Sequence, residues 1–459
     1  MPETSSDSQL GSITGWRKVM RFALPSIAMM MFVSSYSIVD GAFISNYVDT
    51  DALASLNIMY PLFSLISGMG FMFATGGSAY VSNLFGKGRP DDARAAFSQI
   101  LLMSSILCIV FTILGFIFLE PMALLLEADG TLLDGCVRYT SVYLPFTVFL
   151  VLQFITNQFL VVAGRPSIAL LTSIAAGVAN IVLDYVFIVV FGWGLEGAAA
   201  ASGIGSLIPT LIALYLFTIR TLPVHFTRPS KGMKAIGSSV SNGVSEMVSE
   251  ISGGITTLCY NLVMMHYIGP DGVAAISIIA YVQFLAISAV IGYSNGVAPV
   301  MSYHHGAGDR GGMQRLFRIS SVFIMMLSIV IFIAMELFSG TVAKFFADAS
   351  ESVMELIVHG AAIYSIGFLF MGINVYASSL YTSLSNGLIS AAISFIRSLL
   401  LLIPLIIVLP AVFGIDDIWW AVPITEIITT VVVVVTLYRL DGRYGYLSGD
   451  RVSQGRPHG

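Results

Sequence analysis

Long apolar runs recur along the whole chain and are separated by short polar connections. Each run is about 20 residues or longer, which is enough to cross a bilayer as a helix. We predict twelve spans, at residues 20–46, 53–82, 95–119, 132–160, 167–191, 196–219, 237–267, 273–302, 316–338, 354–382, 388–413 and 418–440. The pattern therefore predicts an all-α integral membrane protein with twelve transmembrane helices.

The connections between these spans alternate in charge. One set, together with both chain ends, holds eighteen of the 21 lysines and arginines, whereas the opposite set holds Arg138 and Lys344 beside twelve acidic residues. Basic residues concentrate in cytoplasmic connections. Both termini are therefore predicted to be cytoplasmic.

Composition supports the membrane interpretation. Hydrophobic residues make up 56% of the 459 residues and charged residues 10%, whereas ordinary globular domains carry about 25% charged residues. The start, "MPETSSDSQLGSITGWRK", lacks the pattern of a cleaved signal peptide. Three scattered cysteines indicate neither a disulfide framework nor a metal site. We expect no cofactor and no nucleic-acid partner.

The two halves of the chain are related by an internal repeat. "DALASLNI" (51–58) matches "DGVAAISI" (271–278), and at the same offset Gly76, Gly86 and Gly88 each meet another glycine. We predict bundles of six helices at 1–219 and 237–440, a cytoplasmic linker at 220–236 and a tail at 441–459. Six is an even number, so the repeats are parallel, with a pseudo-twofold axis along the membrane normal. Transporters use this arrangement to rock two bundles about a midplane site.

Three polar residues of the first half fall at one membrane depth. Asp40, Asp184 and Ser202 each lie eight residues from an outer turn, about 12 Å below the surface for a helix. Asn180 is four residues before Asp184 and shares its helix face. Asn or Ser alone is often packing between helices, whereas a carboxylate inside the bilayer indicates function. With no Lys or Arg near that depth in those spans, the two aspartates need a proton or a metal cation such as Na⁺.

Three stretches resemble one transporter family. They are "SIVDGAFISNYVDTDALASLNIMYPLF" (37–63), "GKGRPDDARAAF" (86–97) and "AGRPSIALLTSIAAGVANIVLDYVFIVVFGWGLEGAAAAS" (163–202). With the repeat of six plus six spans, they resemble the multidrug and toxic compound extrusion (MATE) transporters, in particular the MepA-like bacterial exporters. The resemblance implies a multi-pass protein of the bacterial plasma (inner) membrane, and a cation-coupling site at Asp40, Asn180, Asp184 and Ser202. Ser202 stands where relatives often have threonine, so H⁺ and Na⁺ both remain as coupling ions.

The second half carries its own intramembrane charges. Glu246 and Glu250 lie one turn apart on the seventh span. Arg397 of the eleventh span is at a similar depth, so we expect a structural ion pair between Glu246 and Arg397. Glu250 is then left over, and the resemblance favours a role for a glutamate of this span in binding substrate or coupling ion.

A surplus of intramembrane carboxylates favours a cationic substrate. The residues that we expect to contact it are Met29, Tyr60, Gln153, Asn157, Glu250, Asn374 and Glu426. Methionine offers adaptable apolar surface, and the amides offer hydrogen bonds. The implied substrate is an amphipathic, often aromatic organic cation such as a drug or dye.

The function predicted from these residues is secondary active multidrug efflux in exchange for H⁺ or Na⁺ by alternating access, carried out by a monomer. The alternative is a lipid-linked oligosaccharide or lipid flippase of the same superfamily, but one intramembrane arginine is little to hold a pyrophosphate. A membrane enzyme is disfavoured because the spans contain no HExxH or GxSxG motif. A channel fits the composition, but the repeat favours alternating access.

Overall fold

The chain folds into a bundle of long helices, and the computed structural model describes residues 7–48, 50–126, 128–346 and 351–447. The α-helices are α1 Asp7–Gly11, α2 Trp16–Tyr47, α3 Thr50–Gly86, α4 Pro90–Leu125, α5 Gly130–Tyr143, α6 Thr147–Val162, α7 Pro166–Asp184, α8 Gly194–Leu216, α9 Lys234–Tyr267, α10 Pro270–Gly306, α11 Arg310–Phe346, α12 Glu351–Tyr364, α13 Phe368–Ser383, α14 Gly387–Phe395, α15 Ile403–Phe413 and α16 Ala421–Tyr444.

Short 3₁₀ and π segments join several of these helices into longer rods. The 3₁₀ segments are η1 Leu144–Phe146, η3 Ser365–Gly367 and η5 Ile415–Trp420, and the π segments are η2 Tyr185–Val190 and η4 Ile396–Leu402. Thus α5, η1 and α6 form one predicted span, and α7 continues into η2. A π turn displaces the side chains after it, and such turns are frequent at functional sites.

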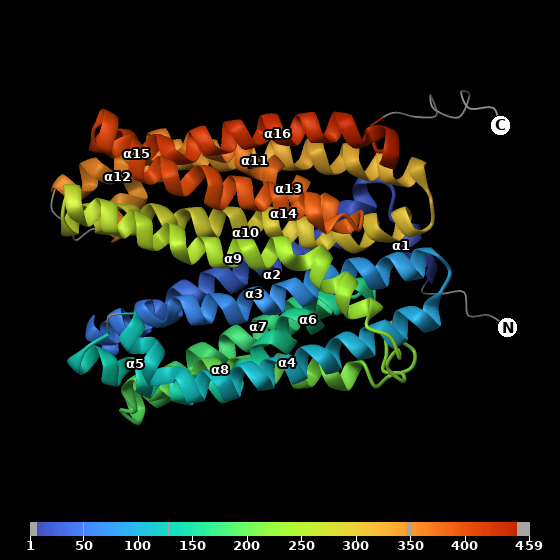
Figure 1. Ribbon diagram of the computed structural model, residues 1–459, viewed down its shortest axis with the longest axis horizontal. Helices are drawn as coiled ribbons and strands as arrows, with labels where there is room; N and C mark the ends of the chain where they lie inside the picture. The colour runs from blue at the N-terminus through green and yellow to red at the C-terminus, as the bar shows by residue number, and fades with distance from the viewer. Residues whose placement is uncertain (1–6, 49, 127, 347–350, 448–459) are drawn as a thin grey trace.

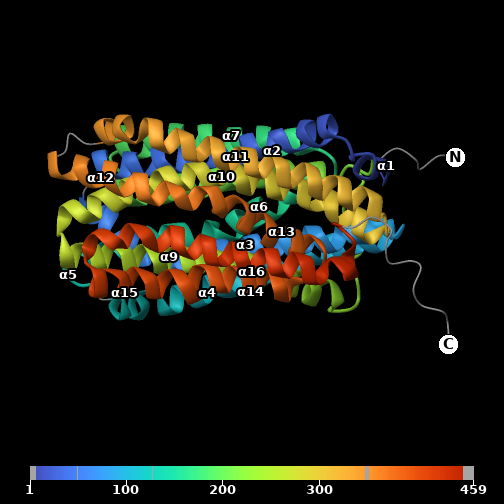
Figure 2. The same ribbon diagram turned by 90° about the horizontal axis from the view of Figure 1, so that it is seen from above.

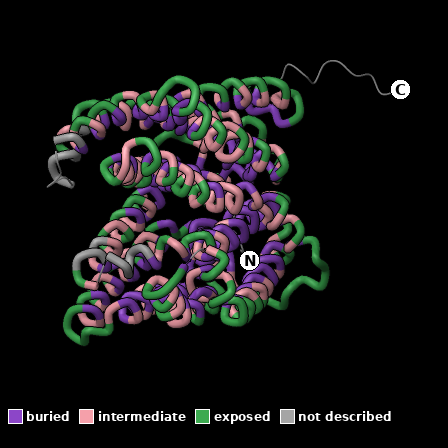
Figure 3. The backbone as a smooth tube through the Cα atoms, turned by 60° about the vertical axis from the view of Figure 1, so that its left-hand side comes forward, coloured by how far each residue is buried: buried purple, intermediate pink, exposed green. Residues whose placement is uncertain are grey.

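Eleven of the twelve predicted membrane helices are confirmed by their length and composition. Within the described residues, eleven helical segments are long and apolar enough to cross a membrane. The remaining predicted span, 237–267, corresponds to α9, which has 34 residues but is rich in Ser and Gly and carries Glu246 and Glu250. Large apolar side chains such as those of Ile117, Leu211 and Leu337 are exposed on the outer surface of the bundle, as expected where the solvent is lipid. Buried residues gather inside each half and between the halves (Figure 3).

The rods form two lobes. The N-terminal lobe (α2–α8) and the C-terminal lobe (α9–α16) occupy opposite halves of the molecule in Figure 1. They meet mainly through α3 against α9, α2 against α10 and α3 against α10. The element α1 and the C-terminal end of α16 lie at the same end of the bundle in Figures 1 and 2, which we call the terminal end. Two equivalent lobes of six rods confirm the predicted fold class.

Glycines bring the lobes into close backbone contact. A Cβ at Gly76 of α3 would overlap the carbonyl oxygen of Ser239 in α9, and a Cβ at Gly243 would overlap the carbonyl oxygen of Met72. At the terminal end, Gly86 of α3 packs in the same way against α10. Larger side chains at these positions would force the helix backbones apart.

The connection between the lobes is packed against the N-terminal lobe. Thr227 N donates to Ser98 Oγ at 2.9 Å, and Gln99 Nε2 donates to Gly232 O at 2.7 Å. The Phe226 ring stacks on Phe97, with 5.6 Å between centroids. Helix α9 begins directly afterwards, at Lys234. The chain from Phe217 to Gly232 is therefore held on α4, although its composition is that of a linker.

Replacing Gln99 by leucine should loosen this connection. A side-chain hydrogen bond contributes about 1 kcal/mol, so we expect about fivefold faster tryptic cleavage at Arg220 and Lys231. Ser105→Ala is the matched control, because its hydroxyl donates to Leu101 O of the same helix and should leave the cleavage unchanged. Equal cleavage of the Gln99→Leu and wild-type proteins would show that the hydrogen bond does not hold the connection.

Candidate functional site

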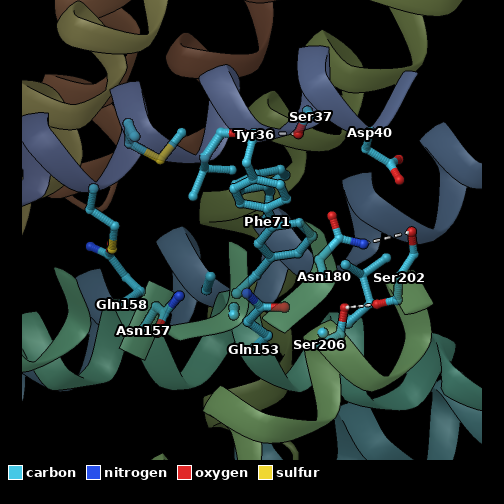
Figure 4. A pocket seen from close by; sticks show the side chains of 18 of the residues that line it. Tyr36, Ser37, Asp40, Phe71, Gln153, Asn157, Gln158, Asn180, Ser202 and Ser206 are labelled. Carbon is cyan, nitrogen blue, oxygen red and sulfur yellow. Dashed lines mark hydrogen bonds between the residues drawn. The ribbon is translucent and has the colours of Figure 1, made fainter. Parts of the chain in front are cut away.

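A cavity of about 250 Å³ lies within the N-terminal lobe (Figure 4). Its walls come from α2, α3, α5, α6, α7 and α8, and Asn295 of α10 adds one residue from the other lobe. Six of the predicted site residues line it, namely Met29, Asp40, Gln153, Asn157, Asn180 and Ser202. The cavity therefore lies among side chains that are far apart in the sequence.

The four residues predicted to bind the coupling ion come together at one side of this cavity. Asn180 Nδ2 donates to Ser202 Oγ at 3.4 Å, and Asp40 lies beside Asn180 (Figure 4). Asp184 is also next to Asp40. Asp184 is fully buried and ends α7, directly before the π segment η2. The equal depth expected for Asp40, Asp184 and Ser202 thus corresponds to spatial proximity.

Several oxygens of this cluster are buried without a hydrogen-bond partner among the described residues. They are Asp40 Oδ1, Asn180 Oδ1 and both carboxylate oxygens of Asp184. Burying an unpartnered carboxylate is costly, so such a group takes up a proton or pairs with a cation. Carboxylate and amide oxygens are also the ligands that hard cations prefer. The cluster is suited to binding either H⁺ or Na⁺.

Three tyrosines surround the aspartates and were missed in the sequence. Tyr36, Tyr139 and Tyr143 line the cavity, and each interacts electrostatically with Asp40. A signal was present in their spacing. Tyr36 is four residues before Asp40, and Tyr139 is four residues before Tyr143, so each pair shares a helix face. Their hydroxyls place further hydrogen-bonding groups next to the carboxylates.

The other side of the cavity is built from amides and aromatic rings. Phe71 and Phe154 stack with 4.2 Å between ring centroids. Asn157 Nδ2 donates to Ser173 Oγ at 3.1 Å, and Gln158 Nε2 donates to Asn295 O at 3.0 Å. Gln153 lies on the same side (Figure 4). This surface can stack on a planar ring and form hydrogen bonds with it.

Tyr60 and Glu250 do not line this cavity. They lie together at the contact between α3 and α9, where Glu250 packs next to Gly68 and the Tyr60 ring packs next to Gly254. Tyr60 is exposed and Glu250 half-buried. Both predicted substrate contacts therefore belong to the interface between the lobes.

The expected ion pair between Glu246 and Arg397 is wrong. Arg397 Nε instead donates to Glu426 Oε1 at 2.7 Å, while Glu246 interacts with Arg397 only electrostatically. Counting residues gives the depth of Arg397 in the membrane, but it does not determine which way its side chain points around the helix. Arg397 also lies in the π segment η4, where the spacing of residues differs from that of an α-helix. Glu426 is the more buried carboxylate, 3% exposed, and has the greater need of a cation.

Two further residues predicted to contact the substrate, Glu426 and Asn374, are engaged here: Glu426 forms the ion pair and Asn374 binds to it. Asn374 Nδ2 donates to Glu426 Oε2 at 2.7 Å and to the Glu426 backbone oxygen at 2.9 Å. Asn374 is fully buried, and neither residue is among those that line the cavity of the N-terminal lobe. Asn374 and Glu426 thus belong to a polar network of the C-terminal lobe.

Comparison with known proteins agrees with this architecture. The MatE family model matches two segments, residues 25–186 and 247–408. The chain is similar to the multidrug export protein MepA of Staphylococcus saprophyticus, with 27% identity over 444 residues, 93% of this chain and 94% of that protein.

Solved structures show the same fold. One is the outward-facing conformation of a multidrug resistance MATE family transporter of the MOP superfamily, with a TM-score of 0.90, 20% identity, and 97% of this chain and 100% of that chain covered. Another is a MOP superfamily transporter from Pyrococcus furiosus, with a TM-score of 0.89, 20% identity, and 97% and 99% covered. The matched segments make up more than half of the chain and correspond to its two lobes. The chain belongs to the MatE family, the multidrug and toxic compound extrusion transporters.

Proposed function

We propose that this transporter exports amphipathic organic cations in exchange for H⁺ or Na⁺ by alternating access. The coupling ion binds at Asp40 and Asp184 with Asn180 and Ser202, and the cargo binds in the cavity beside them. We further propose that the protein works as a monomer in the bacterial plasma membrane, with both termini in the cytoplasm.

One observation carries the proposal, namely the pair formed by the half-buried Asp40 and the fully buried Asp184 at the side of the cavity. Their unpartnered oxygens favour a bound cation, and the described residues that line the cavity include no lysine or arginine to supply the charge internally. When H⁺ or Na⁺ binds, the negative charge that attracts a cationic cargo is reduced. Ion and cargo then favour different states of the protein, which is the requirement for exchange.

The cavity walls support an aromatic cation as cargo. The stacked rings of Phe71 and Phe154 and the thioether of Met29 provide apolar contact, and the amides on the same side provide hydrogen bonds. The cavity has a volume of about 250 Å³. Sites for drug-sized ligands typically have volumes of about 300–1,000 Å³, so this cavity is smaller. We infer that a drug occupies it only after the helices around it move apart.

A flippase for pyrophosphate-linked lipids finds less support. Such a substrate needs free cationic groups, and Arg397 is already bound to Glu426 in the C-terminal lobe. The residues lining the cavity carry a carboxylate instead, which repels a pyrophosphate.

The test is ethidium efflux from proteoliposomes with an imposed H⁺ gradient or an imposed Na⁺ gradient. We expect one of the two gradients to increase the efflux rate about tenfold or more over liposomes with no gradient. Dissipating that gradient with an ionophore should remove the stimulation.

The contradicting results are equally clear. An ethidium efflux rate that neither gradient changes would overturn ion coupling. Export of an anionic dye of the same size, with no export of ethidium, would overturn the cationic cargo.

A further inference from the structure

The two lobes can be compared residue by residue, because their matching helices begin at a constant separation in the sequence. Leu144 of η1 corresponds to Ser365 of η3, and Pro166 of α7 corresponds to Gly387 of α14 at the same offset. At this offset Gln153 corresponds to Asn374, and Ala176 to Arg397. Gln153 and Ala176 both line the cavity of the N-terminal lobe.

The last rod of each lobe extends the comparison. It begins at Gly194 of α8 in the N-terminal lobe and at Ile415 of η5 in the C-terminal lobe, again at the same offset. At this offset Gly205 corresponds to Glu426, and Gly205 also lines the cavity. The N-terminal lobe therefore has an alanine and a glycine at the positions where the C-terminal lobe has Arg397 and Glu426.

The ion pair is held by further fixed contacts. Arg397 Nε lies 2.7 Å from Glu426 Oε1, and Asn374 Nδ2 lies 2.7 Å from Glu426 Oε2. Thr430 Oγ1 donates to Asn374 Oδ1 at 3.0 Å, which fixes the amide orientation. Glu246 adds a second carboxylate that interacts electrostatically with Arg397. This is the chemistry of a guanidinium site, with a buried carboxylate, an orienting amide and a second carboxyl group nearby.

We propose that the C-terminal lobe contains a latent binding site for an organic cation, formed by Glu426 and Asn374, and that Arg397 is a built-in guanidinium that occupies it. The arginine takes the space and the charge that a cargo molecule would take at the equivalent place of the other lobe. The occupied site leaves the N-terminal lobe as the cation-binding lobe. This inference rests on the contacts of the C-terminal lobe and does not depend on the proposed ion coupling.

Removing the arginine side chain should open the site to a ligand that restores the lost group. The probe is ethylguanidinium, which replaces the atoms deleted in Arg397→Ala. At about ten times its dissociation constant, we expect the melting temperature of purified Arg397→Ala protein to rise by about 2 °C, with saturation. The neutral isostere ethylurea should raise it less, because the buried carboxylate requires a charge.

Matched variants separate this site from general effects of the probe. The wild-type protein should not respond, since Arg397 occupies the site. Arg138→Ala removes an arginine that pairs with Glu196 at the surface, with Arg138 itself 51% exposed, and should not respond either. The double variant Arg397→Ala/Glu426→Gln should lose the preference for the guanidinium.

Each outcome decides the proposal. The proposal is overturned if the melting temperature of folded Arg397→Ala protein does not rise with the probe. It is also overturned if the double variant keeps the same preference for the guanidinium. If Arg397→Ala does not fold alone, purification with ethylguanidinium should recover folded protein and purification with ethylurea should not. If neither recovers it, the double variant is measured directly, and ethylurea must stabilise it more than ethylguanidinium. The opposite order overturns the proposal.

Discussion

Replacing Asp184 by asparagine should abolish gradient-driven efflux, with a loss of at least about tenfold, while the protein stays folded in the membrane. The substitution keeps the size of the side chain and removes its charge, so the proposed ion site loses a ligand. Asp40→Asn should have the same effect, because both carboxylates belong to the proposed site. The measurement is ethidium efflux from proteoliposomes with equal amounts of each protein.

Stability should move in the opposite direction to activity. Asp184 is buried with both carboxylate oxygens unpartnered, and Asp40 is a like charge beside it, so removing one charge relieves repulsion and desolvation. We expect an unchanged or higher melting temperature. Asp91→Asn is the control, since Asp91 lies on the surface, 96% exposed, in a weak ion pair with Arg94. Full efflux from either the Asp40→Asn or the Asp184→Asn protein would remove the coupling role from the pair.

Much of the fold could be predicted because a membrane imposes simple constraints. Backbone groups inside a bilayer must be satisfied within helices, so the apolar runs had one interpretation. Even α9, whose Ser, Gly, Glu246 and Glu250 reduce its hydropathy, was recognisable from its place in the repeat. The linker was harder. Residues 220–236 have the composition of a flexible connection, but contacts from Phe97, Ser98 and Gln99 hold most of it on α4.

The depth of the candidate site residues in the membrane could be predicted from the sequence, but the direction of each side chain around its helix axis could not. Counting residues from the turns placed Asp40, Asp184 and Ser202 at one depth, and the structure brings them together. The same count paired Arg397 with Glu246, and there it was wrong. Arg397 lies in a π segment, whereas the count assumes 3.6 residues per turn throughout.

The second large effect is expected where α3 and α10 cross at the terminal end. Gly86 and Gly306 are equivalent positions of the internal repeat and make equivalent contacts. A Cβ on Gly86 would overlap Tyr303 O, and a Cβ on Gly306 would overlap Asn83 O. Because the obstructing atoms are backbone, no rotamer change can relieve the overlap. Gly86→Ala should therefore separate the two helices and lower the free energy of unfolding by about 1–3 kcal/mol.

Separation at this point should also change the conformational equilibrium, because α3 and α10 belong to different lobes and their backbones are in contact at the terminal end. We expect Gly86→Ala and Gly306→Ala to increase the rate at which a cysteine placed at Ser82, fully buried on α3, reacts with a maleimide in a cysteine-free background. Gly253→Ala is the matched control: it lies in α9 with nothing within 4 Å of an added Cβ, and should be neutral or stabilising by up to about 1 kcal/mol. If Gly86→Ala leaves both the melting temperature and the labelling rate unchanged, the crossing does not hold the lobes together. A lower melting temperature without faster labelling would restrict its role to stability, because the proposed alternating access requires this end to open.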